Sequence, residues 1–287
     1  RSKRLVISTI SLIAILFISC INLPNKNFEL IAFDVQNADS FLIKTPENKY
    51  FIIDTGKSGY NGGNSQAMSI IIKYMKDRGI KNIEGLIITH FDNDHSGGAS
   101  DVLDYAKINT IYINTFKDKS YTSKEIYKRL KNKNVKIAKN NDIIYQEEDF
   151  KITTYRKQNS KNDNENSIIA VVKDKNLSVL MMGDASMENL PKEITKAQIL
   201  KVGHHGAKSV VNTNSLKVLR TETAIISTGI NKFGHPNPVT VNQLKNLNLY
   251  RTDKNNSIKI VSNGDEYEVL TFDRDKKKYV EKLKKKV

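Results

Sequence analysis

Two imidazoles and two carboxylates follow directly on a short apolar run, and this feature constrains the fold most. The run Leu86 to Thr89 is typical of a buried strand. The next six residues contain four side chains of the types that commonly bind metals: His90, Asp92, Asp94 and His95. In a tight loop they can converge, and carboxylates packed so closely repel each other unless a cation lies between them. The segment therefore predicts a metal site at the end of a strand.

A helix start is the simpler alternative for this segment. Asp94 or Ser96 could serve as an N-cap, and such a cap is compatible with metal binding. The glycines Gly97 and Gly98 that follow let the backbone turn closely past the site.

The other histidines lie in similar places. All five histidines of the chain come directly after apolar strands or beside glycine: His90, His95, His204, His205 and His235. Paired imidazoles between Gly203 and Gly206 suit a ligand loop, and Asp184 ends another apolar strand. An ordinary loop position for Asp184 and a turn-forming role for His235 are the alternatives.

The remaining pattern predicts one mixed domain of the α/β (α+β) class over residues 28–273, with layered sheets and helices. Helices are expected from Ser65 to Gly79, over 99–107 and over Lys124–Lys131. Strands are expected at Phe28–Val35, Ser40–Lys44, Tyr50–Ile53, Leu86–Thr89, Ile111–Ile113, Phe150–Tyr155, Ser167–Val172, Ser178–Met182, Ile199–Val202, Ala224–Ser227, Ser257–Val261 and Tyr267–Thr271.

Composition agrees with a globular protein. The chain has 287 residues, 39% of them hydrophobic and 27% charged, with a net charge of +15. Its single cysteine excludes a disulfide framework and any cysteine-rich zinc module.

That cysteine stands at the end of the N-terminal segment. Arg1, Lys3 and Arg4 precede the apolar run Leu5–Ile21, as in a signal segment over residues 1–20. The residues before Cys20 resemble a bacterial lipoprotein cleavage box, which predicts a lipid tether to the membrane at Cys20. An uncleaved anchor and plain secretion are the alternatives, and all three place the domain outside the cytoplasm. Residues 21–27 are expected to be a linker.

The C-terminal residues carry a concentrated positive charge. Arg274 to Val287 hold eight Lys and Arg against Asp275 and Glu281. We expect a basic tail over 274–287, either solvated or bound to an anionic partner such as nucleic acid or wall polymer.

Several motifs in one order resemble the metallo-β-lactamase superfamily, and within it the extracellular hydrolase domain of the competence protein ComEC. The motifs are Asp39-Ser40, Asp54-Thr55-Gly56, Thr89-His90-x-Asp92-x-Asp94-His95-x-Gly97-Gly98, Gly183-Asp184, Gly203-His204-His205-Gly206 and Gly234-His235-Pro236-x-Pro238. The resemblance implies a four-layer αββα sandwich with a dinuclear metal site at one edge. The sequence departs from it at Gln36-Asn37-Ala38, where the family usually has glycine on either side of a glutamine, and it shows the hydrolase part without a membrane-spanning channel, as in a standalone hydrolase.

The resemblance also implies the ligands of two divalent ions, Zn²⁺ or Mn²⁺. It places one ion on His90, Asp92 and Asp184, where Asn166 or water completes the set. The second ion is placed on Asp94, His95, Asp184 and one of two adjacent histidines, of which His204 is favoured over His205.

A hydroxide between the ions is then the expected nucleophile. Asp94, His205 and His235 are the expected catalytic residues, the last two as proton donors, while Asp54 is expected to order groups around the ligands. The implied activity is that of a phosphodiesterase or nuclease acting on DNA or another phosphate-bearing polymer. A cell-surface phosphocholine-type esterase and a non-catalytic tethered binding protein are the alternatives.

Overall fold

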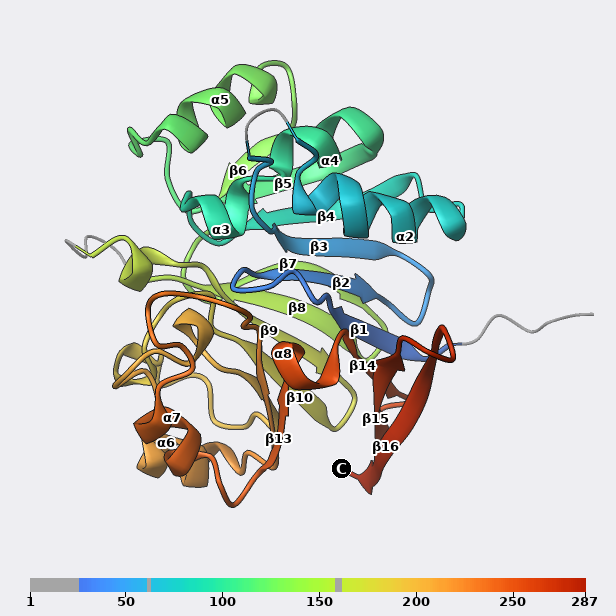
Figure 1. Ribbon diagram of the computed structural model, residues 1–287, viewed down its shortest axis with the longest axis vertical. Helices are drawn as coiled ribbons and strands as arrows, with labels where there is room; N and C mark the ends of the chain where they lie inside the picture. The colour runs from blue at the N-terminus through green and yellow to red at the C-terminus, as the bar shows by residue number, and fades with distance from the viewer. Residues whose placement is uncertain (1–25, 61–62, 158–161) are drawn as a thin grey trace, which may run out of the picture.

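Two β-sheets make up the centre of the computed structural model, which describes residues 26–60, 63–157 and 162–287 (Figure 1). The expected signal segment and most of the expected linker lie outside these residues.

The first sheet has the order β16-β15-β14-β1-β2-β3-β4-β5-β6 and the second β13-β12-β11-β10-β9-β8-β7. The strands of the first sheet are β1 Phe28–Ala32, β2 Ser40–Lys44, β3 Tyr50–Thr55, β4 Asn82–Ile88, β5 Lys107–Ile113, β6 Val135–Ile137, β14 Ile258–Ser262, β15 Glu266–Asp273 and β16 Lys278–Lys286. Those of the second are β7 Asp142–Glu147, β8 Phe150–Tyr155, β9 Ile169–Asp174, β10 Leu177–Met181, β11 Ile199–Lys201, β12 Thr223–Ile226 and β13 Asn248–Arg251.

Helices cover the outer faces of both sheets. Helices α2, α4 and α5 pack on the first sheet, and α6 and α7 lie on the second (Figure 1). The α-helices are α2 Ile72–Asp77, α3 Asn93–Ser96, α4 Ala99–Tyr105, α5 Tyr121–Leu130, α6 Thr213–Leu219, α7 Pro238–Gln243 and α8 Thr252–Asn255. A π-helical turn, η1 Ala67–Ile71, precedes α2, and short 3₁₀ turns are η2 Asn164–Asn166, η3 Met187–Asn189 and η4 His204–Gly206.

The layers follow from the alternation of side chains along each strand. In β1, Leu30 packs between the sheets, while Ile31 packs outward against the helices. In β10, Val179 points to the same inter-sheet core and Leu180 points outward toward α6. Because successive side chains of a strand point to opposite faces, strands that are apolar on both faces need a cover on each side. The expected αββα sandwich is therefore the observed fold.

The order of the strands brings the chemistry-bearing loops together. Strands β3 to β6 run parallel to one another in one sheet, and β10 to β13 do so in the other. The carboxyl ends of β4, β10 and β11 lead into the loops that carry His90, Asp184 and His204. These loops meet at one edge of the sandwich, as the sequence predicted.

Several elements differ from the sequence expectation. Strand β4 begins four residues before the predicted Leu86, and β5 begins at Lys107, where a helix was expected to end. Strands β6, β7 and β13 and helices α6 and α7 were not predicted. Strand β7 and the start of β5 have polar or half-exposed side chains, so they lack the apolar run that marks a buried strand.

The C-terminal residues correct the expected tail. Residues 278–286 form β16, which pairs antiparallel with β15 at the edge of the first sheet. Leu283 and Val287 pack against the inter-sheet core, and Lys284 contacts Glu266 and Glu268 of β15. The lysines between the apolar positions hide this strand in the sequence, and on an edge strand they also oppose pairing with another chain. The globular domain therefore continues beyond residue 273.

Candidate metal centre

The first site residue, His90, comes directly after β4 and is almost completely buried. Its Nδ1 lies 3.1 Å from Thr89 Oγ1 and 3.2 Å from Ser167 Oγ, so hydroxyl groups fix the ring from one side. Its Nε2 points the other way, 3.6 Å from Asp92 Oδ2 and 3.9 Å from Asp184 Oδ2. Three of the predicted ligands are therefore gathered around one point.

Helix α3 presents the next two residues, Asp94 and His95. Asp92 takes the N-cap position of this helix, which the sequence assigned to Asp94 or Ser96 as an alternative. His95 is fully buried, with its Nδ1 2.8 Å from Asp54 Oδ2 and its Nε2 3.1 Å from Asp184 Oδ1. Asp54 also accepts hydrogen bonds from the backbone N–H and the hydroxyl of Thr89. Asp54 thus orients His95, in the place the sequence expected for it.

The loop after β11 separates the two adjacent histidines. His205 is buried, and its Nδ1 donates to the carbonyl oxygen of Ser227 at 3.0 Å, which leaves Nε2 free, 3.4 Å from Asp94 Oδ2. His204 has a side chain 34% exposed, with its Nε2 3.8 Å from Asp184 Oδ2. The structure therefore places His205, rather than the favoured His204, beside Asp94 and His95.

A left-handed backbone produces this arrangement. His204 and His205 have φ values of 47° and 51°, which residues other than glycine rarely adopt. Gly203 precedes them where a side chain would collide with the carbonyl oxygen of Ala185. The two ring centroids lie 6.3 Å apart, with His205 buried and His204 partly exposed. Such conformations persist where the surroundings fix them, and they are common at functional sites.

The chemistry of the donor set fits a divalent cation. Four buried atoms around the centre make no hydrogen bond of good geometry with the described residues, although the second and the fourth lie 3.1 Å apart: His90 Nε2, His95 Nε2, His205 Nε2 and Asp184 Oδ1. Two triads bring their ligand atoms within 4.8 Å of one another, His90-His95-Asp184 and Asp94-His95-His205. Buried polar atoms without partners are costly, and a bound cation would satisfy all four.

The protonation states reflect this concentration of charge. Burial alone would lower the pKa of His95, but the carboxylates of Asp184 and Asp54 outweigh it and hold the pKa well above the usual value. Burial opposes the ionised form of Asp184, yet the neighbouring His95 and His205 hold its pKa well below the usual range. In the metal-free protein the centre is therefore an array of protonated imidazole and ionised carboxylates.

His235 lies at the outer edge of the centre. Its ring centroid is 5.2 Å from that of His204 and 6.5 Å from that of His205. Burial, followed by the charges of the neighbouring histidines, lowers the pKa of His235, and burial lowers that of His204. The two imidazoles therefore form a neutral pair between the centre and solvent.

Lys201 was not recognised in the sequence, and Asp39 was named there only within the Asp39-Ser40 motif, without a role in the centre. Lys201 is buried, forms an ion pair with Asp39 and donates a hydrogen bond to the carbonyl oxygen of Gly183 at 2.8 Å. Asp39 in turn lies 3.6 Å from His205 Nδ1 and 3.7 Å from His95 Nδ1. A lysine inside the apolar run Ile199–Val202 is the signal that could have found this pair, because buried lysines need a partner.

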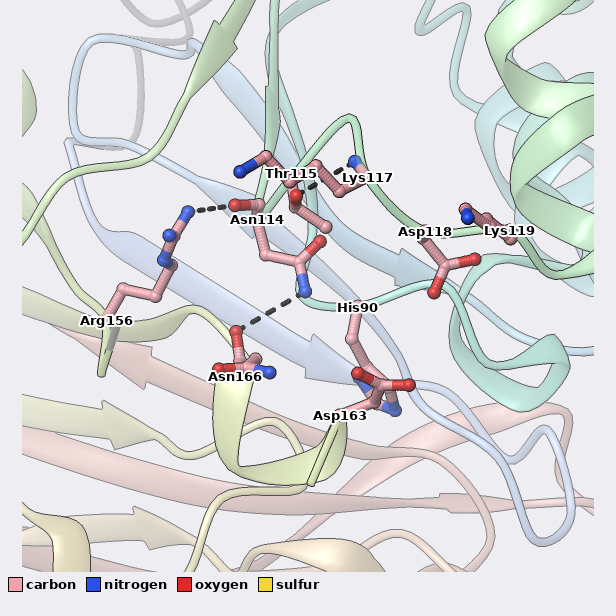
Figure 2. A pocket seen from close by; sticks show the side chains of 9 residues that line it. All are labelled: His90, Asn114, Thr115, Lys117, Asp118, Lys119, Arg156, Asp163 and Asn166. Carbon is pink, nitrogen blue, oxygen red and sulfur yellow. Dashed lines mark hydrogen bonds between the residues drawn. The ribbon is translucent and has the colours of Figure 1, made fainter. Parts of the chain in front are cut away.

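A cavity of about 410 Å³ opens beside His90. Asn166, expected to complete the first metal site, lines it, and its backbone oxygen accepts from Asn114 Nδ2 at 3.4 Å (Figure 2). Metal binding by the Asn166 side chain stays a prediction.

Comparison with known protein families shows to which family this chain belongs. The sequence model of the metallo-beta-lactamase superfamily matches residues 34–230. The chain belongs to this superfamily. It is a metal-dependent hydrolase by that membership, with His and Asp clusters suited to a divalent metal.

The similar proteins are competence and recombination proteins. The chain is 26% identical over 251 residues to "ComE operon protein 3" of Bacillus subtilis. The aligned region covers 80% of this chain and 32% of that protein. The chain is 32% identical over 212 residues to "Recombination protein 2" of Haemophilus influenzae, covering 72% of this chain and 25% of that protein. The chain thus spans about a third or less of the length of these relatives. Among the described residues, no helix has the length and apolar character that a membrane span requires.

Solved structures agree on the fold. The metallo-beta-lactamase fold protein YhfI from Bacillus subtilis superposes with a TM-score of 0.56 at 13% identity, over 82% of this chain and 99% of that chain. The diiron beta-hydroxylase CmlA from Streptomyces venezuelae gives 0.51 at 12% identity, over 84% of this chain and 54% of that one. At such low identity these similarities concern the fold alone.

Proposed function

We propose that this protein is an extracytoplasmic phosphodiesterase that cleaves DNA or another phosphate-bearing polymer with two divalent ions, Zn²⁺ or Mn²⁺. The observation that carries the proposal is the convergence of unpartnered imidazole and carboxylate atoms at the edge where the loops of both sheets meet. Such a donor set gives a charged, water-accessible centre suited to the hydrolysis of phosphoesters.

The two ions divide the ligands between the loops. His90, Asp92 and Asp184 would hold one ion, and Asp94, His95 and His205 would hold the other, with Asp184 reaching both. Mixed imidazole and carboxylate ligands suit Zn²⁺ and also Mn²⁺, which tolerates more oxygen donors. Bound at such ligands, divalent ions activate water and stabilise the negative charge that develops on an attacked phosphoryl group.

The surrounding side chains keep the ligands oriented. The Asp54 carboxylate holds His95, and the Ser227 carbonyl holds His205, so that each ring turns its Nε2 toward the centre. His204 and His235 stand outside this layer as neutral imidazoles. As a neutral imidazole, each could donate a hydrogen bond to the leaving oxygen.

A phosphate polymer fits the surroundings better than a choline ester does. The net charge of +15 favours polyanions, and the cavity beside His90 is lined by Lys117, Lys119 and Arg156. A choline headgroup is usually held by aromatic rings, and apart from His90 no aromatic side chain lines the cavity among the described residues. The printed names of the relatives, which refer to competence and recombination, also support DNA.

The location is part of the proposal. The apolar run that ends at Cys20 supports a lipid tether outside the cytoplasm. Metabolic labelling with a fatty acid tests it, since Cys20→Ser should abolish the label. Retention of the label in this variant would contradict a tether at Cys20.

The activity is tested by assaying the full chain on single- and double-stranded oligonucleotides, a chromogenic phosphodiester and a chromogenic phosphocholine ester. We expect hydrolysis of the first three with Mn²⁺ or Zn²⁺, loss with chelator, and loss in Asp184→Asn. Cleavage of the phosphocholine ester alone would favour the esterase. Tight binding of DNA without cleavage under any metal would favour a binding protein.

A further inference from the structure

The cavity beside His90 differs from the metal centre in its chemistry. It is lined by the loop that follows β5, by the end of β8 and by η2, and His90 forms the boundary between the two sites (Figure 2). Its volume of about 410 Å³ lies in the range of roughly 300–1,000 Å³ that is typical of small-ligand sites. A substrate group next to the one being hydrolysed therefore has a formed place to bind.

Three basic side chains line this cavity, together with two acidic ones, Asp118 and Asp163. Lys117 and Lys119 are exposed there and form no ion pair among the described residues, and Arg156 is half-buried. The acidic Asp118 accepts a hydrogen bond from the Ser120 backbone N–H. Burial raises the pKa of Asp118, but hydrogen bonds from Ser120 and Ser123 outweigh this and lower it. Asp118 is thus held by hydrogen bonds within its own loop, and the three basic groups outnumber the two carboxylates of the cavity.

Arg156 is held in place without being neutralised. Its Nη1 donates to the backbone oxygen of Asn114, as Figure 2 shows, rather than to a carboxylate. By contrast, Arg129, Arg251 and Arg274 each contact an aspartate. An oriented guanidinium with free N–H groups beside a cavity is the group that proteins use to bind phosphate.

The amide of Asn114 adds a neutral contact. Its Nδ2 donates to the backbone oxygen of Asn166, while its Oδ1 is buried and has no partner among the described residues. Buried acceptors without a partner are costly, so a ligand that carries a hydroxyl or amine would satisfy this oxygen.

We propose that this cavity is a phosphate subsite, in which Arg156, Lys117 and Lys119 bind the phosphate next to the scissile one. The inference rests on the proposed function, because it assigns a neighbouring phosphate to the same substrate. The ligand class is a chain with phosphates on both sides of one sugar or polyol unit. A substrate with a single phosphodiester would lack this contact.

Binding of unreactive bisphosphates to the metal-loaded full chain tests the subsite. Thymidine 3′,5′-bisphosphate is compared with the 3′- and the 5′-monophosphate by calorimetry, since none of the three contains a diester. One phosphate can occupy the metal centre, so the gain from the second phosphate reports the cavity. We expect a gain of about tenfold in affinity, as charge-assisted hydrogen bonds usually provide.

Two variants remove the gain separately. Arg156→Gln and the double variant Lys117→Gln/Lys119→Gln should each reduce it at least threefold, whereas Lys217→Gln, an exposed lysine on α6, should not change it. The double variant changes only exposed side chains and is expected to fold, which a melting curve verifies. Arg156→Lys should restore part of the gain.

The outcomes separate this inference from the proposed function. A gain that survives in both cavity variants, or that falls equally in Lys217→Gln, would overturn the subsite. A gain lost only in the cavity variants supports it even if no diester is hydrolysed, in which case the proposed activity fails and the phosphate site stands. Glycerol 1,3-bisphosphate against glycerol 1-phosphate then identifies the source, because a gain restricted to thymidine indicates nucleic acid and a gain in both indicates phosphate alone.

Discussion

The Nε2 atom of His205 lies 3.4 Å from Asp94 Oδ2, whereas the partly exposed imidazole of the neighbouring His204 has its Nε2 3.8 Å from Asp184 Oδ2. Two adjacent histidines with left-handed φ values are therefore placed for different tasks. The inner ring completes a set with Asp94 and His95, and the outer ring faces the side from which a substrate arrives.

This division predicts different effects of two otherwise similar substitutions. His205→Ala should remove one ligand and leave close to one metal equivalent per chain, whereas His204→Ala should keep two. The outer variant should instead lower kcat for DNA by about 10²-fold, because it removes a hydrogen bond to the leaving oxygen. Elemental analysis of the reconstituted proteins and single-turnover rates measure both quantities. Loss of metal from His204→Ala alone would reverse the assignment.

The contact between Asp54 and His95 predicts that Asp54 affects metal affinity by holding the ring of a ligand. Asp54→Asn removes the carboxylate that fixes the His95 ring, and losses of this kind weaken metal binding by about 10–100-fold. The dissociation constant is measured by competition with a chromogenic chelator. Asp104→Asn, which breaks only a surface contact with Arg129, is the matched control and should leave the constant unchanged. Equal constants for the wild type and Asp54→Asn would show that the ring is held by other contacts.

The pKa of His95 predicts how metal binding depends on pH. In the metal-free protein this pKa lies well above 6.5, so the imidazole is still protonated at neutral pH. A metal ion must displace that proton, and the apparent affinity should therefore rise as pH increases from 6 to 8. Calorimetry in buffers of different ionisation enthalpy should detect proton release on binding. An affinity independent of pH over this range would mean that His95 enters the reaction already neutral.

The raised pKa of His95 also makes the stability of the metal-free fold depend on pH, in the opposite direction to the metal affinity. A group with a raised pKa in the folded state stabilises the metal-free protein below its unfolded value of about 6.5, and this contribution is lost as pH rises through the folded pKa. The metal-free chain should therefore lose stability at alkaline pH, and the metal-loaded chain should lose less. Urea unfolding at pH 6 and pH 9, with metal and with chelator, provides the comparison.

The sequence predicted the metal edge better than it predicted the periphery. His90, Asp92, Asp94 and His95 could be placed because a buried strand leads straight into them, and this depends only on local order along the chain. The inward position of His205 could not be placed, because it depends on φ values that the neighbouring glycines and the contact with Ser227 determine. Asp39 and Lys201 are 162 residues apart, and their ion pair arises only when the two sheets pack.

Strand β16 shows the same limit at the other end of the chain. Its lysines match those of a solvated tail, and only pairing with β15 makes Leu283 part of the core. Deleting residues 274–287 should therefore lower the free energy of unfolding by at least about 2 kcal/mol, the order expected for uncovering buried apolar side chains. Lys278→Gln/Lys282→Gln/Lys286→Gln changes exposed positions only and should stay within about 0.5 kcal/mol of the wild type. A deletion that leaves unfolding by urea unchanged would restore the interpretation as a dispensable tail.

The buried ion pair between Lys201 and Asp39 gives the sharpest stability prediction. Both side chains are about 1% exposed, and Lys201 Nζ also donates to the Gly183 carbonyl two residues after β10. Lys201→Met keeps the length of the side chain but leaves the Asp39 carboxylate buried without a cation, which should cost about 3–5 kcal/mol. Adding Asp39→Asn removes that charge, so the double variant should recover a large part of the loss and reveal a coupling energy between the two sites.

Lys196→Met, at an exposed position before β11, controls for the loss of a lysine as such. Urea unfolding of the wild type, Lys201→Met, Asp39→Asn, the double variant and the Lys196→Met control, with chelator present, isolates the effect from metal binding. Losses that simply add in the double variant would mean that the two side chains stabilise the fold independently.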